Sequence, residues 1–218
     1  MAQIIDVIIP VYNNEEGLIR CLNSLDNQVL DRSLFKVVIV DDGSNPQLKP
    51  ELWSRFDLNI NFKRHKKNRG LPAALNTALD ISNSRYFVRI DSDDYVHEMF
   101  LSCLLLAFTC DNSTFAAAAD YKMVDEFENH IANVSSQENP IGCGIMFKRI
   151  VLKKIGMYNE EYLLAEEVEF MHRFTQYYKM KRIEIPLYRY TQRANSLTSD
   201  KAAYAKYKAK VGEDNNHV

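Results

Sequence analysis

The chain has 218 residues, of which 46% are hydrophobic and 26% are charged, proportions typical of a folded globular protein. Its 27 basic and 29 acidic residues give a formal net charge of −2, which argues against a protein that coats nucleic acid. The four cysteines lack CxxC spacing and indicate reduced thiols rather than a disulfide framework or a zinc site.

Targeting and membrane signals are weak in this sequence. The first residues lack the basic region of a signal peptide, and the longest apolar stretch, FLSCLLLAF, spans about half of the ~20 residues that a membrane helix needs. We therefore expect a cytoplasmic protein without a transmembrane segment. The lysines of the C-terminal stretch DKAAYAKYKAKV leave room for a weak peripheral contact with the inner face of a membrane, although a solvated helix is the simpler interpretation.

The first half of the chain alternates predicted strands and helices. In chain order these are a strand over 4–12, a helix over 13–28, strands over 35–42 and 59–62, a helix over 71–82 and a strand over 86–90. Asn13 or Asn14 can cap the first helix, and Pro72 suits the first turn of the second. Strands that are apolar throughout favour a parallel sheet covered on both faces.

The second half is predicted less regularly. Its elements are a helix over 97–110, a strand over 115–124, a polar mobile loop over 129–142, a short strand and helix over 144–156, a helix over 167–178 and a strand over 181–191. The sequence thus predicts one α/β domain with a mostly parallel central sheet and helices on both faces. A charged helix and polar tail over 199–218 would extend it.

Polar residues follow three of the predicted strands. They occupy positions 10–13, 41–44 and 91–94. If these strands are parallel neighbours, their carboxyl ends meet at one crevice, where open α/β sheets bind ligands. Tyr12 then offers a stacking face, and Asp41 or Asp42 accepts hydrogen bonds from a base or sugar. The alternative for residues 42–44 is a simple turn, in which Gly43 supplies a positive φ.

The acidic run after the third strand is the strongest candidate for a metal site. Carboxylates such as Asp91 and Asp93 suit a hard cation, Mg²⁺ or Mn²⁺, whose shell is completed by water and substrate phosphates. Acidic turns are common, so this pattern alone is weak. For Asp94, capping of the following helix and support of the site from behind both remain open.

The segment KRHKKNRG over 63–70 is strongly basic. Such a run usually forms a solvated loop, but beside the acidic residues Arg69 could offset the charge of a diphosphate with its forked donors. His65 is predicted to lie at the surface, because no second histidine stands at metal-binding spacing.

Four motifs in order resemble family 2 glycosyltransferases with the GT-A fold: VIIPVYNNEEGLIRCLNSL, VVIVDDGS, NRGLPAALNTAL and RIDSDDYV. The segments FKRIVLKKIGMYNEEYLLAEEVEFMHRF and IPLYRYTQRANSLT extend the resemblance to about residues 4–198. It implies a Rossmann-like GT-A domain over 1–198, with a nucleotide-binding part over about 1–96 and an acceptor-side part over about 97–198.

The resemblance also implies roles for individual residues. The nucleotide-binding set is Pro10, Val11, Tyr12, Asp41, Asp42, Arg69 and Asp91. Asp93, with Asp91, would hold Mn²⁺ or Mg²⁺. Glu167 matches the catalytic base, which would take a proton from the acceptor hydroxyl during a displacement that inverts the anomeric carbon. A solvated acidic helix start is the other interpretation of Glu167.

Two positions depart from the family pattern. Glu167 stands where the family usually has aspartate, and no histidine follows the last YR pair, where many members carry a metal ligand. Here the chain continues as Tyr190, Thr191, Gln192 and Arg193. Thr191, Gln192 or water would have to complete the metal shell.

The resemblance predicts transfer of a sugar from a nucleotide-diphosphate donor to a hydroxyl of a glycan or lipid-linked acceptor, in polysaccharide or glycoconjugate biosynthesis. UDP is the favoured nucleotide because Asp42 can accept from uracil, and GDP and dTDP stay open. A nucleotidyltransferase is disfavoured, since IIPVYNNEEG lacks a glycine-rich phosphate loop. A non-catalytic sugar-nucleotide or protein-binding domain is the remaining alternative.

Overall fold

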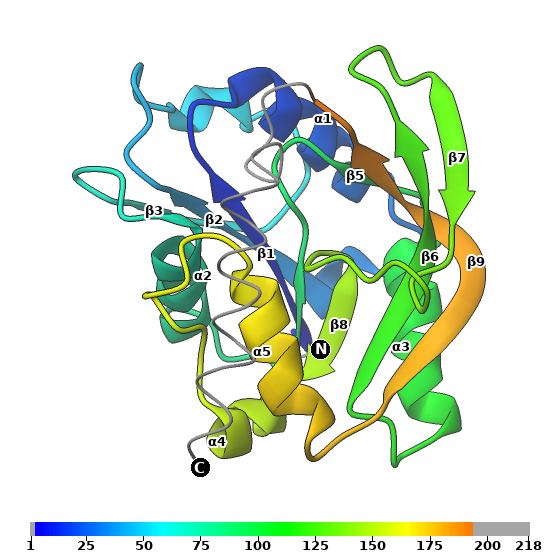
Figure 1. Ribbon diagram of the computed structural model, residues 1–218. Helices are drawn as coiled ribbons and strands as arrows, with labels where there is room; N and C mark the ends of the chain where they lie inside the picture. Colours follow the sequence, from blue (N-terminus) through cyan, green and yellow to red (C-terminus); the bar gives the residue numbers. More distant parts are fainter. Residues whose placement is uncertain (1–2, 194–218) are drawn as a thin grey trace.

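The computed structural model describes residues 3–193 of the chain (Figure 1). The predicted helix and tail over 199–218, and the predicted domain end at residue 198, lie outside these described residues. Within the described part, the strands join in one sheet of order β3-β2-β1-β4-β8-β6-β9-β5, with β7 paired to β6.

The first part of the sheet is parallel. Its strands are β1 (Ile5–Val11), β2 (Phe35–Asp41), β3 (Ile60–Arg64) and β4 (Tyr86–Arg89). Strand β1 pairs in parallel with β2 on one side and with β4 on the other, and β2 pairs in parallel with β3. Their carboxyl ends therefore reach the same edge, as the sequence predicts for the three polar segments.

The second part of the sheet is mixed. Its strands are β5 (Tyr95–Val96), β6 (Ala116–Val124), β7 (His130–Val134), β8 (Ile145–Lys148) and β9 (Met180–Thr191). Strand β8 joins the two parts, antiparallel to both β4 and β6, while β9 runs parallel to β6 and antiparallel to β5. The long β9 curves along one side of the molecule in Figure 1.

Two expectations for the second part need correction. The loop predicted over 129–142 contains strand β7, which forms a hairpin with β6 because its polar residues pair at the sheet edge. The two-residue strand β5 was not predicted, since Tyr95 and Val96 are too short a segment to show a period. The predicted α/β domain, with parallel central strands and helices on both faces, is confirmed.

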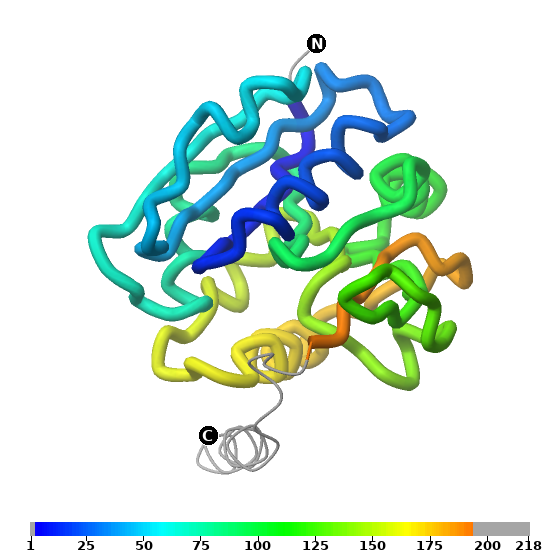
Figure 2. The backbone as a smooth tube through the Cα atoms, turned by 90° about the horizontal axis from the view of Figure 1, so that it is seen from above, coloured from blue at the N-terminus to red at the C-terminus, as the bar shows by residue number. Residues whose placement is uncertain are grey.

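Helices cover both faces of the sheet. They are α1 (Glu15–Asp26), α2 (Leu71–Asp80), α3 (Phe100–Cys110), α4 (Leu152–Ile155) and α5 (Glu166–Thr175), with 3₁₀ turns over Arg32–Leu34, Pro50–Leu52 and Arg149–Val151. Helices α1 and α3 pack on one face, and α2, α4 and α5 on the other. Figure 2 shows α1 and α5 on opposite sides of the sheet.

Strand β1 contributes to both cores because its side chains alternate. Ile5, Val7 and Ile9 face the core with α1 and α3, whereas Ile8 faces the core with α2 and α5. Burying each such side chain contributes about 1.5–3 kcal/mol. This continuous burial explains why the β1 sequence is apolar at nearly every position.

Asp6 is the exception in β1, and it is fully buried. Its carboxylate accepts hydrogen bonds from Ser84 N at 2.8 Å and Ser84 Oγ at 2.7 Å, and it lies 3.0 Å from Arg149 Nη2. These partners offset the cost of burying the charge. The network ties the start of β1 to the start of β4, at the edge opposite the carboxyl ends.

Candidate active site

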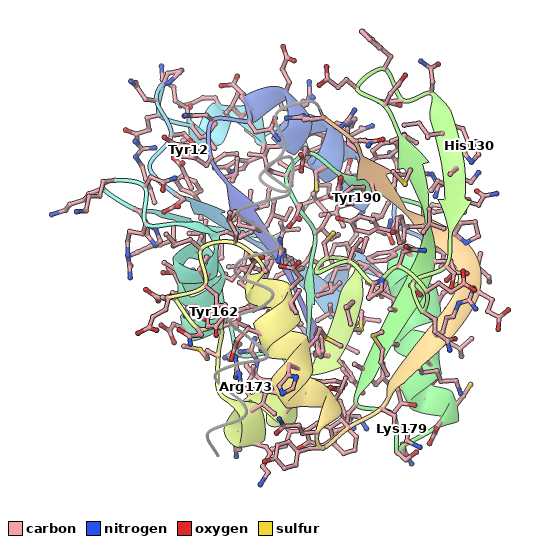
Figure 3. All side chains as sticks on the ribbon, viewed as in Figure 1. Tyr12, His130, Tyr162, Arg173, Lys179 and Tyr190 are labelled. Carbon is pink, nitrogen blue, oxygen red and sulfur yellow. The ribbon has the colours of Figure 1, made fainter. Side chains whose placement is uncertain are left out.

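A cavity of about 980 Å³ opens at the carboxyl ends of the parallel strands. The predicted site residues that line it are Pro10, Val11, Tyr12, Asp42, Arg69, Asp91, Asp93 and Glu167. Figure 3 places Tyr12 and Tyr190, both cavity residues, toward the same end of the molecule, with Arg173 and Lys179 at the other. Asp41 is the one predicted residue that does not line the cavity.

The end of β1 supplies an aromatic face. Tyr12 follows the last β1 residue and is 50% exposed, although Val11 before it is buried. The next residue, Asn13, has φ +50 and turns the chain toward α1. Its backbone N–H donates to Ser44 Oγ at 2.9 Å, so the turns after β1 and β2 support each other.

Asp41 and Asp42 have different surroundings. The buried Asp41 accepts from Ser44 N at 2.8 Å and pairs with Arg64, so its carboxylate supports the turn after β2. Asp42 accepts from Arg69 N at 2.9 Å and from Gly70 N at 2.8 Å. Asp42 therefore holds the 69–70 segment against the end of β2 while it lines the cavity.

His65 lies buried behind Asp42 and does not line the cavity, which corrects the prediction that it lies at the surface. It is 7% exposed, its Nδ1 lies 2.6 Å from Asp42 Oδ1, and its Nε2 lies 2.9 Å from Thr77 Oγ1. The basic run predicts exposed side chains, and Lys66 and Lys67 are exposed as expected, whereas His65 within the same run is buried.

Gly43 allows the loops after β2 and before α2 to meet. Its φ is +82, and a Cβ at this position would lie 2.5 Å from the backbone carbon of Lys67 and 2.7 Å from Asn68 N. Only glycine fits both the backbone conformation and the close approach. Arg69 follows at the cavity rim, 46% exposed, with Nη2 3.5 Å from Glu160 Oε2.

The acidic loop after β4 separates its carboxylates. Asp91 and Asp93 line the cavity with side chains 25% and 30% exposed. Asp94 accepts a hydrogen bond from Tyr188 Oη at 2.6 Å and from Thr191 N at 2.7 Å, so it anchors β9 and caps no helix. Burial, with the charges of Asp93 and Asp91, raises the pKa of Asp94 well above its ordinary value.

The donor set of this loop fits a hard divalent cation. Burial and the adjacent Asp91 charge raise the pKa of Asp93, while the charges of Arg193 and Arg20 oppose the rise. Asp91, Asp94 and Cys143 bring their ligand atoms within 4.8 Å of one another, but a thiol is a poor ligand for Mg²⁺ or Mn²⁺ and Asp94 is engaged by β9. Asp93 and Asp91 offer the carboxylate oxygens that such a cation prefers, although Arg89 already donates to both oxygens of Asp91.

Arg193 stands in the loop where a histidine ligand was expected from the resemblance. Its Nε lies 3.8 Å from Asp93 Oδ2, and its terminal nitrogens lie 3.3 Å from Asn14 Oδ1. Asn14 is also the N-cap of α1 and accepts from Gly17 N at 3.3 Å. A cationic side chain thus accompanies Asp93 in the loop that lacks a histidine.

Helix α5 brings two adjacent glutamates to the cavity, and the structure distinguishes them. Glu166 is 3% exposed and its Oε1 accepts from Arg89 Nη1 at 2.8 Å. Burial raises the pKa of Glu166 to about 7, with Glu167 adding to the rise and Arg89 opposing it. Glu167 is less buried and lines the same cavity.

Sequence reasoning missed Arg89, the buried residue that ends β4. Its Nε donates to Asp91 Oδ1 at 2.6 Å and its Nη2 to Asp91 Oδ2 at 3.0 Å. The available signal was a charged residue inside the apolar run YFVRI, two positions before the acidic cluster. Asn14, Cys143 and Arg193 were likewise absent from the predicted site, and all three line the cavity.

The family model for glycosyl transferase family 2 matches residues 6–184. The chain belongs to this family. Among its curated relatives, the poly(ribitol-phosphate) β-N-acetylglucosaminyltransferase TarP of Staphylococcus aureus is 34% identical over 102 residues, 46% of this chain and 31% of TarP. The putative glycosyltransferase EpsH of Bacillus subtilis is 29% identical over 127 residues, 57% of this chain and 35% of EpsH.

Solved structures of other glycosyltransferases share the fold of this family 2 member. Residues 1–349 of S. aureus TarS in complex with UDP-GlcNAc superpose with a TM-score of 0.74 at 22% identity, over 96% of this chain and 65% of that one. The mannosyltransferase PcManGT of Pyrobaculum calidifontis, in complex with GDP-Man and Mn²⁺, gives 0.76 at 17% identity, over 100% and 65%. The GT-A fold is thereby shown.

The match to curated relatives is partial. The chain spans from 15% to 35% of their length. Among the described residues, no helix is long and apolar enough to cross a membrane.

Proposed function

We propose that this family 2 member transfers a sugar from a nucleotide-diphosphate donor, with UDP as the nucleotide, to a hydroxyl of a glycan or lipid-linked acceptor. One observation carries the proposal. An aromatic face, a buried carboxylate, the Asp91 and Asp93 pair and a glutamate at a helix start line one cavity at the carboxyl ends of parallel strands. A cavity of about 980 Å³ has room for a nucleotide sugar.

The donor would lie across the ends of β1 and β2. Tyr12 would stack on the base, with Pro10 and Val11 forming the adjacent wall. Asp42 would accept from the base, while it keeps the 69–70 loop in place. Arg69 would face the phosphates, since its guanidinium is half exposed at the rim and its partner Glu160 is distant at 3.5 Å.

Asp93 would be the main contact of a divalent cation, with Asp91 beside it. Mn²⁺ or Mg²⁺ bound there would supply positive charge that favours departure of the diphosphate. Arg193 would add a fixed positive charge on the same side, because it already lies 3.8 Å from Asp93. Asp41 has no direct part in this proposal, since Ser44 and Arg64 occupy its carboxylate.

The transfer would be a single displacement with inversion. The Glu167 carboxylate would take the proton of the acceptor hydroxyl as that oxygen forms a bond to the anomeric carbon. The bond from the anomeric carbon to the phosphate oxygen breaks, and the nucleoside diphosphate leaves with the electron pair. Glu167 is preferred over Glu166 as the base because Arg89 occupies the Glu166 carboxylate.

The donor part would comprise about residues 1–96 and the acceptor-side part about 97–198. Family membership favours a place in polysaccharide or glycoconjugate biosynthesis, and TarP and TarS, which are named for poly(ribitol-phosphate) acceptors, favour a polyol or glycan hydroxyl. A non-catalytic sugar-nucleotide-binding domain is the second candidate, favoured by the absence of histidine from residues 188–193.

The proposal is tested by calorimetric titration with UDP, GDP and dTDP, with and without Mn²⁺, followed by assays of UDP release from UDP-sugars. We expect UDP to bind and Mn²⁺ to tighten binding in the wild type but not in Asp93→Asn. Glu167→Gln should lower UDP release at least about a thousandfold and leave UDP affinity nearly unchanged. Binding of no nucleotide would exclude the transferase, and binding without turnover by the wild type would favour the second candidate.

A further inference from the structure

Arg89 connects the two sides of the cavity. It ends β4, and its guanidinium forms two hydrogen bonds to Asp91 on the donor side, at 2.6 and 3.0 Å. The third donor, Nη1, reaches Glu166 Oε1 at 2.8 Å, 77 positions later in the chain. One buried side chain therefore joins the acidic loop to the first residue of α5.

The shape of arginine is essential to this connection. Its planar fork donates to both oxygens of one carboxylate while a third N–H addresses another partner. A lysine keeps the charge but offers a single ammonium that cannot hold both carboxylates in the same geometry. Burying the arginine between two acids is costly unless each contact is well formed.

The packing around Arg89 extends the connection to Glu167. A Cβ on Gly142 would lie 2.5 Å from Glu167 Cβ and 3.1 Å from Arg89 Nη1, so these three groups pack without spare room. The backbone of the same segment is fixed as well, because Gly144 N donates to the carbonyl of Arg89 at 2.8 Å. A displacement of the Arg89 guanidinium would therefore also displace the first residues of α5.

We propose that Arg89 is a positioning residue that sets the distance between the donor-side carboxylate Asp91 and the base Glu167. The inference rests on the proposed transferase function. Arg89 contacts neither the donor nor the acceptor in this role. It acts through Asp91 on one side and through Glu166 and the α5 backbone on the other, and a displacement of about 1 Å at such a site can lower a rate about a hundredfold.

The test compares two conservative substitutions at arginines that pair with an aspartate, the buried Arg89 and the partly buried Arg149. Arg89→Lys retains the charge and removes the fork. Arg149→Lys is the matched control, since Arg149 also donates to a buried aspartate, Asp6, and to Ser82 Oγ at 2.6 Å, but at the opposite edge of the sheet. Both variants should lose stability, so the change in unfolding temperature measures the structural effect alone.

For Arg89→Lys we expect kcat for UDP release from a UDP-sugar to fall about 10- to 100-fold, with UDP affinity within about threefold of wild type. Tyr12, Asp42 and Asp93 remain in place, and the lysine keeps a positive charge beside Asp91. Arg149→Lys should retain wild-type kcat. Equal kcat in the two variants would overturn the inference, as would loss of UDP binding in Arg89→Lys, which would make Arg89 part of the donor site.

A second variant serves if Arg89→Lys does not fold. Glu166→Gln leaves the fork on Asp91 and weakens only the link to α5, so kcat should fall by about 3- to 10-fold at unchanged UDP affinity. An unchanged kcat overturns the inference, and a loss as large as that of Glu167→Gln would make Glu166 itself the base and overturn it too. A wild-type protein that binds UDP-sugars without turnover would instead refute the proposed function, and the inference with it.

Discussion

The two sides of the cavity, which we propose to hold the donor and the acceptor and which we call the donor side and the acceptor side, are built in different ways. On the donor side, parallel strands β1, β2 and β4 end together, and short turns directly after them carry the site residues. On the acceptor side, the wall comes from the 140–143 segment, the α5 start and the end of β9, which are far apart in sequence. The donor side thus depends on local turn chemistry, and the acceptor side on long-range packing.

This difference predicts which region is more sensitive to substitution. The donor-side turns cannot accommodate an added side-chain atom, because the backbones of the loops after β2 and before α2 are in contact at Gly43. The β6–β7 hairpin belongs to the proposed acceptor-side part of the chain but does not line the cavity, and its turn residue Phe127 is 84% exposed. We expect effects to decrease from the first region to the second.

The largest effect is expected from Gly43→Ala. The substitution adds positive-φ strain and a clash with the Lys67 and Asn68 backbone, so unfolding free energy should fall by about 3 kcal/mol or more. UDP affinity should fall at least about tenfold, since the loop that carries Arg69 must move. Urea denaturation and calorimetry measure the two quantities.

Gly156→Ala is the control for this change. Gly156 also has a positive φ, +74, but its added Cβ would meet no atom closer than 3.6 Å and lies outside the cavity. It should lose stability through strain of about 1–3 kcal/mol and keep wild-type UDP affinity. Unchanged UDP affinity in Gly43→Ala would contradict the view that the donor-side turns cannot accommodate an added side-chain atom.

An intermediate effect is expected at Glu166, which Arg89 links to the donor side, and it should appear in how the stability of Glu166→Gln depends on pH. Burial raises the pKa of Glu166 to about 7 from 4.5, so the folded state holds a proton that the unfolded state has released between these pH values. Folding stability from this group is present at low pH and falls as pH rises through that window, then stays level. Glu166→Gln does not lose folding stability in this way, because glutamine does not titrate.

The stability of Glu166→Gln relative to wild type should therefore increase between pH 5 and pH 8, by on the order of 1–3 kcal/mol. Urea denaturation of both proteins at each pH gives the difference, in which all shared titrating groups cancel. Parallel pH profiles for the two proteins would mean that Arg89 keeps Glu166 ionised throughout.

The smallest effect is expected from Phe127→Ser in the hairpin. The side chain is exposed, and the turn is held by Asp125, which accepts from Phe127 N at 2.9 Å and Asn129 N at 2.8 Å whatever side chain residue 127 carries. Stability should change by less than about 0.5 kcal/mol and UDP affinity not at all. Val124→Ala, buried in the same hairpin, should cost about 1 kcal/mol or more. A larger loss for Phe127 would mean that the hairpin tip is packed in solution.

The same contrast explains what could be predicted from the sequence. The runs 4–12 and 35–42 and the cap at Asn14 are local patterns, and the structure forms them as expected. Most of the predicted site residues follow such runs, and they meet in one cavity because the strands are parallel neighbours.

The failures concern contacts between distant residues. His65 turns inward because its two ring nitrogens form hydrogen bonds with Asp42 and Thr77, and Arg89 is matched by Glu166 far along the chain. The hairpin strand β7 is polar because it lies at a sheet edge, so its composition resembles that of a loop. The residues next to His65, Arg89 and β7 in the sequence do not reveal which distant residues these will contact.

The place of β9 in the sheet has a consequence for how the chain folds during synthesis. The short strand β5, which begins directly after the acidic loop, has its ladder partner at Tyr188 and Arg189. Asp94 likewise finds its partners only at Tyr188 and Thr191. The parallel strands β1 to β4 can pair as soon as they leave the ribosome, but the loop that holds Asp93 must wait for nearly a hundred further residues. We expect the nascent chain to complete the cavity late, in one step with the docking of β9.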